Sequence, residues 1–203
     1  MLFAKAPVAG AVKTRLIPAL GAASAAQLHQ RLVLRALETL IAADVGPVEI
    51  CCAPDCAHAF FVACQQRFGV HLTSQRDGDL GQRMHHAFAR ALLSAPCALI
   101  VGADCPSITV ADVRDAAAQL ANVEATLIPA DDGGYVLIGA RLMHPDMFSG
   151  IDWGTATVLA AQRERFRALG WRWCEGATRW DVDRPEDLPR LRELDVPIAF
   201  QAE

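Results

Sequence analysis

Short apolar runs alternate along the chain with longer stretches in which apolar residues recur every three to four positions. Each short run is predicted to be a strand, and these runs are Leu2–Lys5, Val48–Ala53, Val70–Thr73, Cys97–Gly102, Ala125–Pro129, Tyr135–Gly139 and Trp171–Cys174. The stretches with helical spacing are 24–43, 55–68, 80–93, 109–120, 155–169 and 185–194. This alternation predicts an α/β fold, a three-layer sandwich with a mostly parallel, mixed sheet between two layers of helices.

Local signals support these elements. Ser24, with Gln27 three residues later, is a capping-box pattern for the start of a helix, and Pro185 suits a first helical turn. The continuous apolar run Cys97–Gly102 is typical of a central parallel strand that is buried on both faces. Because the chain has no internal repeat, low-complexity tract or linker, we expect residues 1–203 to form one domain.

Composition narrows the class of protein. The 203 residues are 53% hydrophobic and 21% charged, with a net charge of -4, which is atypical of disordered chains and of general nucleic-acid or membrane-surface binders. No apolar run reaches the roughly 18 residues of a membrane span, and the N-terminus lacks the basic-then-apolar order of a signal peptide. Seven cysteines fit a reducing compartment, so we expect a cytoplasmic protein.

The loop after the first strand is a candidate phosphate site, because ligands of such sheets bind just beyond the carboxyl ends of the strands. Its small residues Ala6 and Gly10 let backbone approach a ligand closely, and Lys13 and Arg15 follow. Backbone N–H groups together with Lys and Arg commonly hold phosphate oxygens. The loop contains neither the P-loop pattern nor G-x-G-x-x-G, and the alternative is an ordinary solvated loop.

Two aspartates are predicted to hold a divalent metal. Asp104 directly follows the central strand, and Mg²⁺ prefers one or two carboxylates together with substrate phosphates and water. The alternative for Asp104 is a helix-cap or turn aspartate. Asp181 and Asp183 point to opposite sides if that segment is extended, so only one of them can share a metal with Asp104, and we choose Asp183.

Two further loops supply candidates. After the third strand, Gln75, Asp79 and the backbone at Gly81 can contact a base or ribose, unless Asp79 is only a helix cap. Asp131 and Asp132 lie in a tight turn whose two glycines a hairpin explains in full. The hairpin does not explain two adjacent acids, and we favour Asp132 as a contact for the acceptor substrate or the metal.

Five motifs in one order resemble a bacterial family of GT-A-fold transferases, whose members are usually labelled glycosyltransferases, some linked to arsenosugar biosynthesis or to radical-SAM neighbours. The motifs are 3–16, 78–83, 102–106, 132–139 and 181–188, and they span nearly the whole chain. The chain is also similar to small nucleotidyltransferases such as the 2-phospho-L-lactate guanylyltransferases. In enzymes of that fold two carboxylates hold Mg²⁺, and the matching positions are Asp104 and Asp183. The first loop departs by lacking the Gly-Gly pair of many sugar nucleotidyltransferases.

These observations predict a metal-dependent transferase that uses Mg²⁺ or Mn²⁺. The preferred reaction is nucleotidyl transfer from an NTP to a small phosphorylated or anionic acceptor, with Lys13 and Arg15 neutralising charge on the phosphates. One alternative is a glycosyltransferase with a nucleotide-sugar donor, in which Asp132 acts as the base for the acceptor. A further alternative is a non-catalytic nucleotide-binding protein. The predicted partners are the nucleotide and the acceptor, without nucleic acid or membrane.

Overall fold

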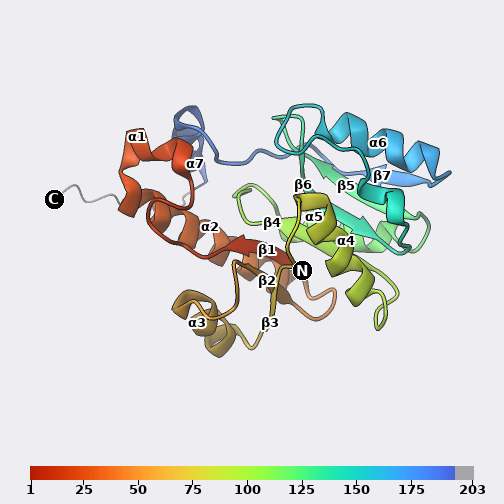
Figure 1. The fold of residues 1–203 in the computed structure, drawn as a ribbon, viewed down its shortest axis with the longest axis horizontal. Coiled ribbons are helices and arrows are strands. Elements are labelled where there is room, and N and C mark those ends of the chain that lie inside the picture. The colour runs from red at the N-terminus through yellow and green to blue at the C-terminus, as the bar shows by residue number, and fades with distance from the viewer. Residues whose placement is uncertain (195–203) are drawn as a thin grey trace.

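The computed structural model describes residues 1–194 and has a seven-stranded sheet as its middle layer (Figure 1). The strands are β1 (Leu2–Lys5), β2 (Glu49–Ala53), β3 (His71–Ser74), β4 (Ala98–Gly102), β5 (Ala125–Pro129), β6 (Tyr135–Ala140) and β7 (Trp173–Glu175). Their order in the sheet is β3-β2-β1-β4-β6-β5-β7. Only β6 runs antiparallel to its neighbours, β4 and β5. The prediction of a mostly parallel, mixed sheet with the 97–102 run at its centre is therefore confirmed.

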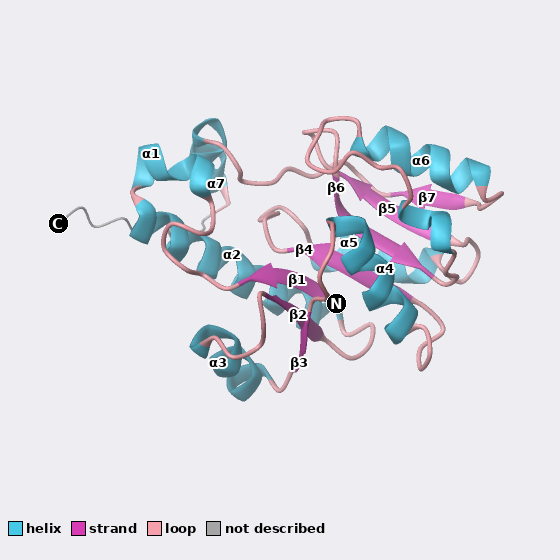
Figure 2. Ribbon diagram, viewed as in Figure 1, coloured by secondary structure: helices cyan, strands magenta, loops and turns pink. Residues whose placement is uncertain are grey.

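Helices cover both faces of this sheet (Figure 2). Along β4, Leu99 and Val101 pack into one core cluster and Ile100 into the other, as the alternation of side chains requires. The first cluster contains α2 (Ala22–Ala43), α3 (Ala59–Phe68) and α5 (Val110–Gln119). The second contains α4 (Leu80–Ala91), the 3-10 turn η2 (Pro145–Phe148) and α6 (Val158–Ala168). The predicted three-layer sandwich is confirmed.

A small third cluster joins the first loop to the late segment. The loop after β1 contains two short helices that the sequence analysis does not predict, η1 (Thr14–Leu16) and α1 (Ile17–Leu20). The predicted last helix is divided into η3 (Pro185–Asp187) and α7 (Leu188–Glu193). Leu16, Leu28, Val182 and Leu191 are buried together in this cluster, so α1 and α7 lie next to each other (Figure 1).

Helix starts are where the predictions differ most from the structure. The helix expected over 55–68 begins at Ala59, because the side chain of His58 caps it by accepting from the Phe60 N–H. The helix expected over 155–169 begins at Val158. Residues 195–203 of the expected single domain lie outside the described part of the chain. Among residues 1–194, none of the helices has the length and apolar character that crossing a bilayer requires.

Candidate functional site

A cleft of about 510 Å³ opens at the carboxyl ends of β1 and β4, where ligands of open α/β sheets bind. Five residues that the sequence analysis singles out line it together: Lys13, Arg15, Gln75, Asp104 and Asp183. They come from the loops after β1, β3 and β4 and from the segment that precedes η3. The fold thus brings four distant segments to one place.

Lys13 links three of these segments through one ammonium group. Its backbone is left-handed (φ 48°), and its side chain is only 3% exposed. Its Nζ lies 2.6 Å from Asp104 Oδ1 and donates a hydrogen bond to the carbonyl oxygen of Val182. The ammonium group therefore has one ion-pair partner and one hydrogen-bond partner inside the protein. Lys13 holds the Asp104 loop and the 181–183 segment against the first loop.

Asp104 presents its two carboxylate oxygens to different surroundings. Oδ1 is buried, whereas the whole side chain is 49% exposed, so the exposed area lies mainly on the outer oxygen, Oδ2. Burial alone would raise the pKa of Asp104, but Lys13 and His29 outweigh it and hold the pKa well below its usual range. Asp104 is therefore an anion with one oxygen turned to the cleft.

His29 is a residue of the cleft that the sequence analysis misses. It lies on α2, is 5% exposed, and its Nε2 is 3.0 Å from the carbonyl oxygen of Lys5. Its Nδ1 is 3.7 Å from Asp104 Oδ1. The sequence does contain a signal for this residue. His29 is a polar residue on the apolar face of its helix, because Leu32 and Val33 follow it by three and four positions.

The backbone of Asp183 is fixed by hydrogen bonds, whereas its side chain forms an exposed ion pair. Its N–H and that of Arg184 both donate to Asp187 Oδ2, at 2.9 and 2.7 Å. Its carboxylate forms an ion pair with Arg15, and these side chains are 41% and 59% exposed. An ion pair this exposed stabilises little, about 0–1 kcal/mol. Either side chain can therefore leave the ion pair and bind a ligand in the cleft instead.

Asp181 is the other acid of this segment, and its side chain lies within electrostatic reach of Asp104 and Lys13. Burial raises its pKa to about 6, and the negative charges of Asp132 and Asp104 add to the effect. It does not line the cleft as Asp183 does. Asp104, Asp132 and Asp181, which come from three different loops, therefore lie close enough for their charges to interact.

Five predicted site residues lie outside the cleft lining. Ala6 is buried, and Gly10 is exposed with a φ of 84°. Asp79 caps α4 in a capping box with Gln82, its alternative role. Gly81 leaves room for Trp153, because a Cβ there would lie 2.8 Å from the Trp153 ring. Asp132 Oδ1 accepts from the Gly134 N–H at 2.8 Å within its own turn. Their roles toward a ligand stay predictions.

Arg179 anchors the chain just before the 181–183 segment. Its guanidinium donates two hydrogen bonds to Asp112, at 2.8 and 2.6 Å. Asp112 also caps α5 in a capping box with Thr109, and its side chain is 10% exposed. Burial would raise the pKa of Asp112, but the hydrogen bonds from Arg179 and Thr109 lower it below its usual value.

We expect Asp112→Asn to lower the free energy of unfolding by about 1.5 kcal/mol at pH 7, because it removes a charged, bidentate interaction. The folded-state pKa is depressed, so this stability is present above the unfolded value near 4 and is lost as the pH falls through the folded value. Urea unfolding at pH 7 and in acid measures it. Asp115→Asn, an exposed change on the same helix, is the control, and equal losses at pH 7 would contradict the assignment.

The donor set of the cleft fits a hard divalent cation completed by its substrate. Among the side chains that the structure describes, no three His, Cys, Asp or Glu residues form a ready-made metal site. Mg²⁺ and Mn²⁺ need fewer protein ligands, since one or two carboxylates suffice when phosphates and water complete the shell. Asp104 and Asp183 both line the cleft and carry carboxylate oxygens of this kind.

The fold and the cleft together define a transferase with the nucleotide-diphospho-sugar transferase fold. The structure of a "putative nucleotide-diphospho-sugar transferase" from Desulfovibrio desulfuricans G20 is similar, with a TM-score of 0.87 and 32% identity over 100% of this chain and 89% of that one. A family model described as "Uncharacterized protein conserved in bacteria (DUF2064)" matches residues 36–155, and the chain belongs to this family. Among curated proteins, none matches the chain in sequence.

More distant structures share the fold alone. CMP:2-keto-3-deoxy-manno-octonic acid synthetase in complex with CTP has a TM-score of 0.57 and 16% identity over 95% of both chains. Rv0371c from Mycobacterium tuberculosis H37Rv in complex with manganese has a TM-score of 0.53 and 16% identity over 95% of this chain and 96% of that one. The predicted resemblance to GT-A-like transferases and nucleotidyltransferases is confirmed.

Proposed function

We propose that the protein is a metal-dependent nucleotidyltransferase that transfers a nucleotidyl group from an NTP to a small phosphorylated or anionic acceptor. The observation that carries the proposal is the cleft itself. It gathers Asp104 and Asp183 opposite the basic first loop with Lys13 and Arg15. Two carboxylates facing a cationic loop suit a nucleotide polyphosphate with its cation.

Asp104 and Asp183 would hold Mg²⁺ or Mn²⁺, which supplies positive charge against the phosphate oxygens when bound. Lys13 keeps Asp104 ionised and oriented through the buried oxygen, so that the outer oxygen stays available. Gln75, which also lines the cleft, is the proposed contact for base or ribose.

In the proposed reaction an oxygen of the acceptor attacks the α-phosphorus of the NTP, and a hydroxyl acceptor releases its proton to water. The bond from that phosphorus to the bridging oxygen breaks, and pyrophosphate leaves with the electron pair. Negative charge gathers on the leaving group, and Arg15, which is 59% exposed, is free to turn toward it. Most of the catalysis is then positioning and electrostatics.

Glycosyl transfer is the second candidate. The observation that favours it is the relative at 32% identity, described as a nucleotide-diphospho-sugar transferase. The same cleft would hold the leaving nucleoside diphosphate, and Asp132 would serve as the base for the acceptor hydroxyl. The proposed place of either reaction is the cytoplasm, which the seven free thiols support.

A product assay separates the two reactions. The protein is incubated with each of ATP, GTP, CTP and UTP, with Mg²⁺, Mn²⁺ or EDTA, and a panel of phosphorylated and carboxylated alcohols. We expect pyrophosphate release that requires both metal and acceptor. Release of nucleoside diphosphate from nucleotide-sugars, without pyrophosphate from NTPs, would replace the proposal by glycosyl transfer. Turnover in EDTA equal to that with metal would contradict the metal assignment.

A further inference from the structure

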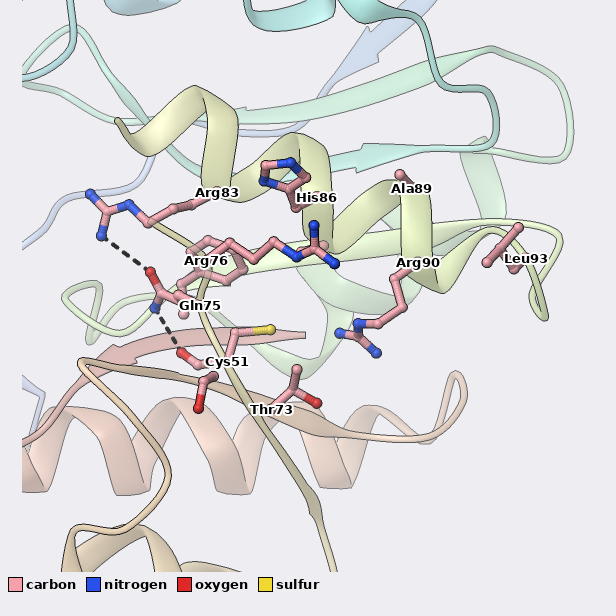
Figure 3. Close-up of a pocket in the computed structure, with 12 residues that line it drawn as sticks. Cys51, Thr73, Gln75, Arg76, Arg83, His86, Ala89, Arg90 and Leu93 are labelled. Carbon is pink, nitrogen blue, oxygen red and sulfur yellow. Dashed lines mark hydrogen bonds between the residues drawn. The ribbon is translucent and has the colours of Figure 1, made fainter. Parts of the chain in front are cut away.

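A second cavity, of about 490 Å³, lies beside the cleft, between α4 and the strands β1, β2 and β3 (Figure 3). We call it the arginine pocket, because Arg76, Arg83 and Arg90 line it together with His86. Arg83, His86 and Arg90 are spaced i, i+3 and i+7 on α4 and so share one face of that helix. Arg76 comes from the loop after β3, and its side chain extends along the pocket beneath α4 (Figure 3).

Acidic groups do not balance the positive charge of this pocket. None of the described residues that line it is acidic. Arg90 is paired with Glu49 at 2.6 Å, but Arg76 has neither an ion pair nor a hydrogen bond to the side chains and backbone that the structure describes. Within the described part of the chain, the Arg83 guanidinium donates its hydrogen bonds to two neutral oxygens, the Asp79 carbonyl at 3.3 Å and Gln75 Oε1 at 3.2 Å. In a chain of net charge -4, two uncompensated guanidinium groups at one cavity favour an anionic ligand.

The neighbouring cleft differs in its charge balance. There Lys13 is matched by Asp104 and Arg15 by Asp183, each in an ion pair. A divalent cation bound with the nucleotide cancels about half of the negative charge that the polyphosphate adds to that cleft. The unmatched positive charge therefore lies in the arginine pocket and not in the cleft proposed for the nucleotide.

The floor of the arginine pocket is apolar. Phe3 and Cys51 project from the sheet and Ala87 from α4, and all three belong to the core cluster on this face. An inorganic ion would leave such a floor unused, whereas an organic anion would cover it. A volume near 490 Å³ is in the range of small-molecule sites. The geometry thus suits a small organic molecule with one anionic group.

The two cavities are continuous. Both are lined by Phe3, Gln75 and Arg83. Gln75 is held at this border, because its Nε2 donates to the carbonyl oxygen of Cys51 at 2.7 Å and its Oε1 accepts from Arg83. A ligand in the arginine pocket would therefore lie next to a nucleotide in the cleft.

We propose that the arginine pocket binds the anionic group of the acceptor, a carboxylate or phosphate monoester on a small organic molecule, with Arg76 and Arg83 as its partners. This inference rests on the proposed function and adds the substrate class. A guanidinium suits both anions, because its parallel N–H groups match two oxygens of a carboxylate or a phosphate.

Isothermal titration calorimetry on the whole protein with phenyl phosphate and benzoate tests the pocket, with benzyl alcohol as the neutral analogue. We expect both anions to bind and the alcohol not to bind. Arg76→Gln should weaken the anions about tenfold, because a hydrogen bond to a charged group is lost. Arg67→Gln is the matched control, because this exposed arginine on α3 changes the charge equally and lines neither cavity. It should leave binding unchanged.

Every other outcome of these titrations contradicts a specific part of the proposal. Absence of binding, or equal weakening by Arg76→Gln and Arg67→Gln, removes the pocket. Competitive displacement of phenyl phosphate by an NTP with Mg²⁺ assigns the pocket to the nucleotide and removes the acceptor from it. NTP binding by the unmodified protein is measured in the same calorimeter. If no NTP binds, the proposed function is contradicted, whereas anion binding in the arginine pocket is unaffected.

Discussion

Asp104→Asn is expected to lower turnover about a thousandfold and to lower the free energy of unfolding by about 2 kcal/mol. The loss of turnover follows from the outer oxygen, because an uncharged amide cannot balance the cation proposed for the cleft. The loss of stability follows from the inner oxygen. Without the negative charge, the ammonium of Lys13, whose side chain is 3% exposed, stays buried beside a neutral group. The cost stays below the roughly 3–5 kcal/mol of fully buried pairs, because Asp104 is half exposed.

The two effects separate in a double-mutant cycle. Lys13→Met alone should cost less stability than Asp104→Asn, because Asp104 can then turn to water. The double variant should be no less stable than Asp104→Asn, because the buried ammonium is gone, and it should remain inactive. Urea unfolding gives the stabilities, and pyrophosphate release gives the turnover. Full turnover in Asp104→Asn would refute the metal assignment, and additive stability losses would refute the coupling between the two residues.

The fold could be predicted where a pattern repeats over several turns or a whole strand. The 22-residue helix α2 shows its apolar face many times over, and β4 is a continuous apolar run. The four-residue helix α1, which has Pro18 in its first turn, is too short to show any period. The start of α3 depends on the cap formed by the His58 side chain, a contact that no spacing rule indicates.

The sequence predicts those residues of the candidate site that directly follow a strand. Asp104 follows β4 and the first loop follows β1, so the rule for parallel sheets places both at one edge. His29 lies in the middle of a helix, and its proximity to Asp104 arises only from the way α2 packs on the sheet. The arginine pocket depends on which cations find partners. Arg90 is paired with Glu49, whereas Arg76 has no ion-pair partner among the described residues, a difference that only the three-dimensional structure reveals.

Gly133→Ala is expected to lower the free energy of unfolding by about 3 kcal/mol, or the melting temperature by about 10 °C. Two penalties act at this position. Its φ of +91° is one that side chains rarely adopt, and a Cβ would collide with the carbonyl oxygen of Ala156 and lie 2.8 Å from its Cα. These are backbone atoms that cannot rotate away. The Leu159 N–H also donates to the Gly133 carbonyl at 2.9 Å, which ties the turn to the start of α6.

Alanine substitutions at two other glycines separate the cost of the backbone strain from the cost of the collision. Gly154 has a φ of +83° and open space around it, so Gly154→Ala measures the backbone strain alone, about 1 kcal/mol. At Gly134 the nearest atom to a Cβ is the side-chain oxygen Asp132 Oδ1, at 3.2 Å, and the φ is not positive, so Gly134→Ala should cost least. Thermal unfolding of the three variants should rank Gly133→Ala as clearly the least stable. If Gly133→Ala only equals Gly154→Ala, the turn moves away from Ala156 at little cost, and Asp132 is then not held rigidly enough to act as a base.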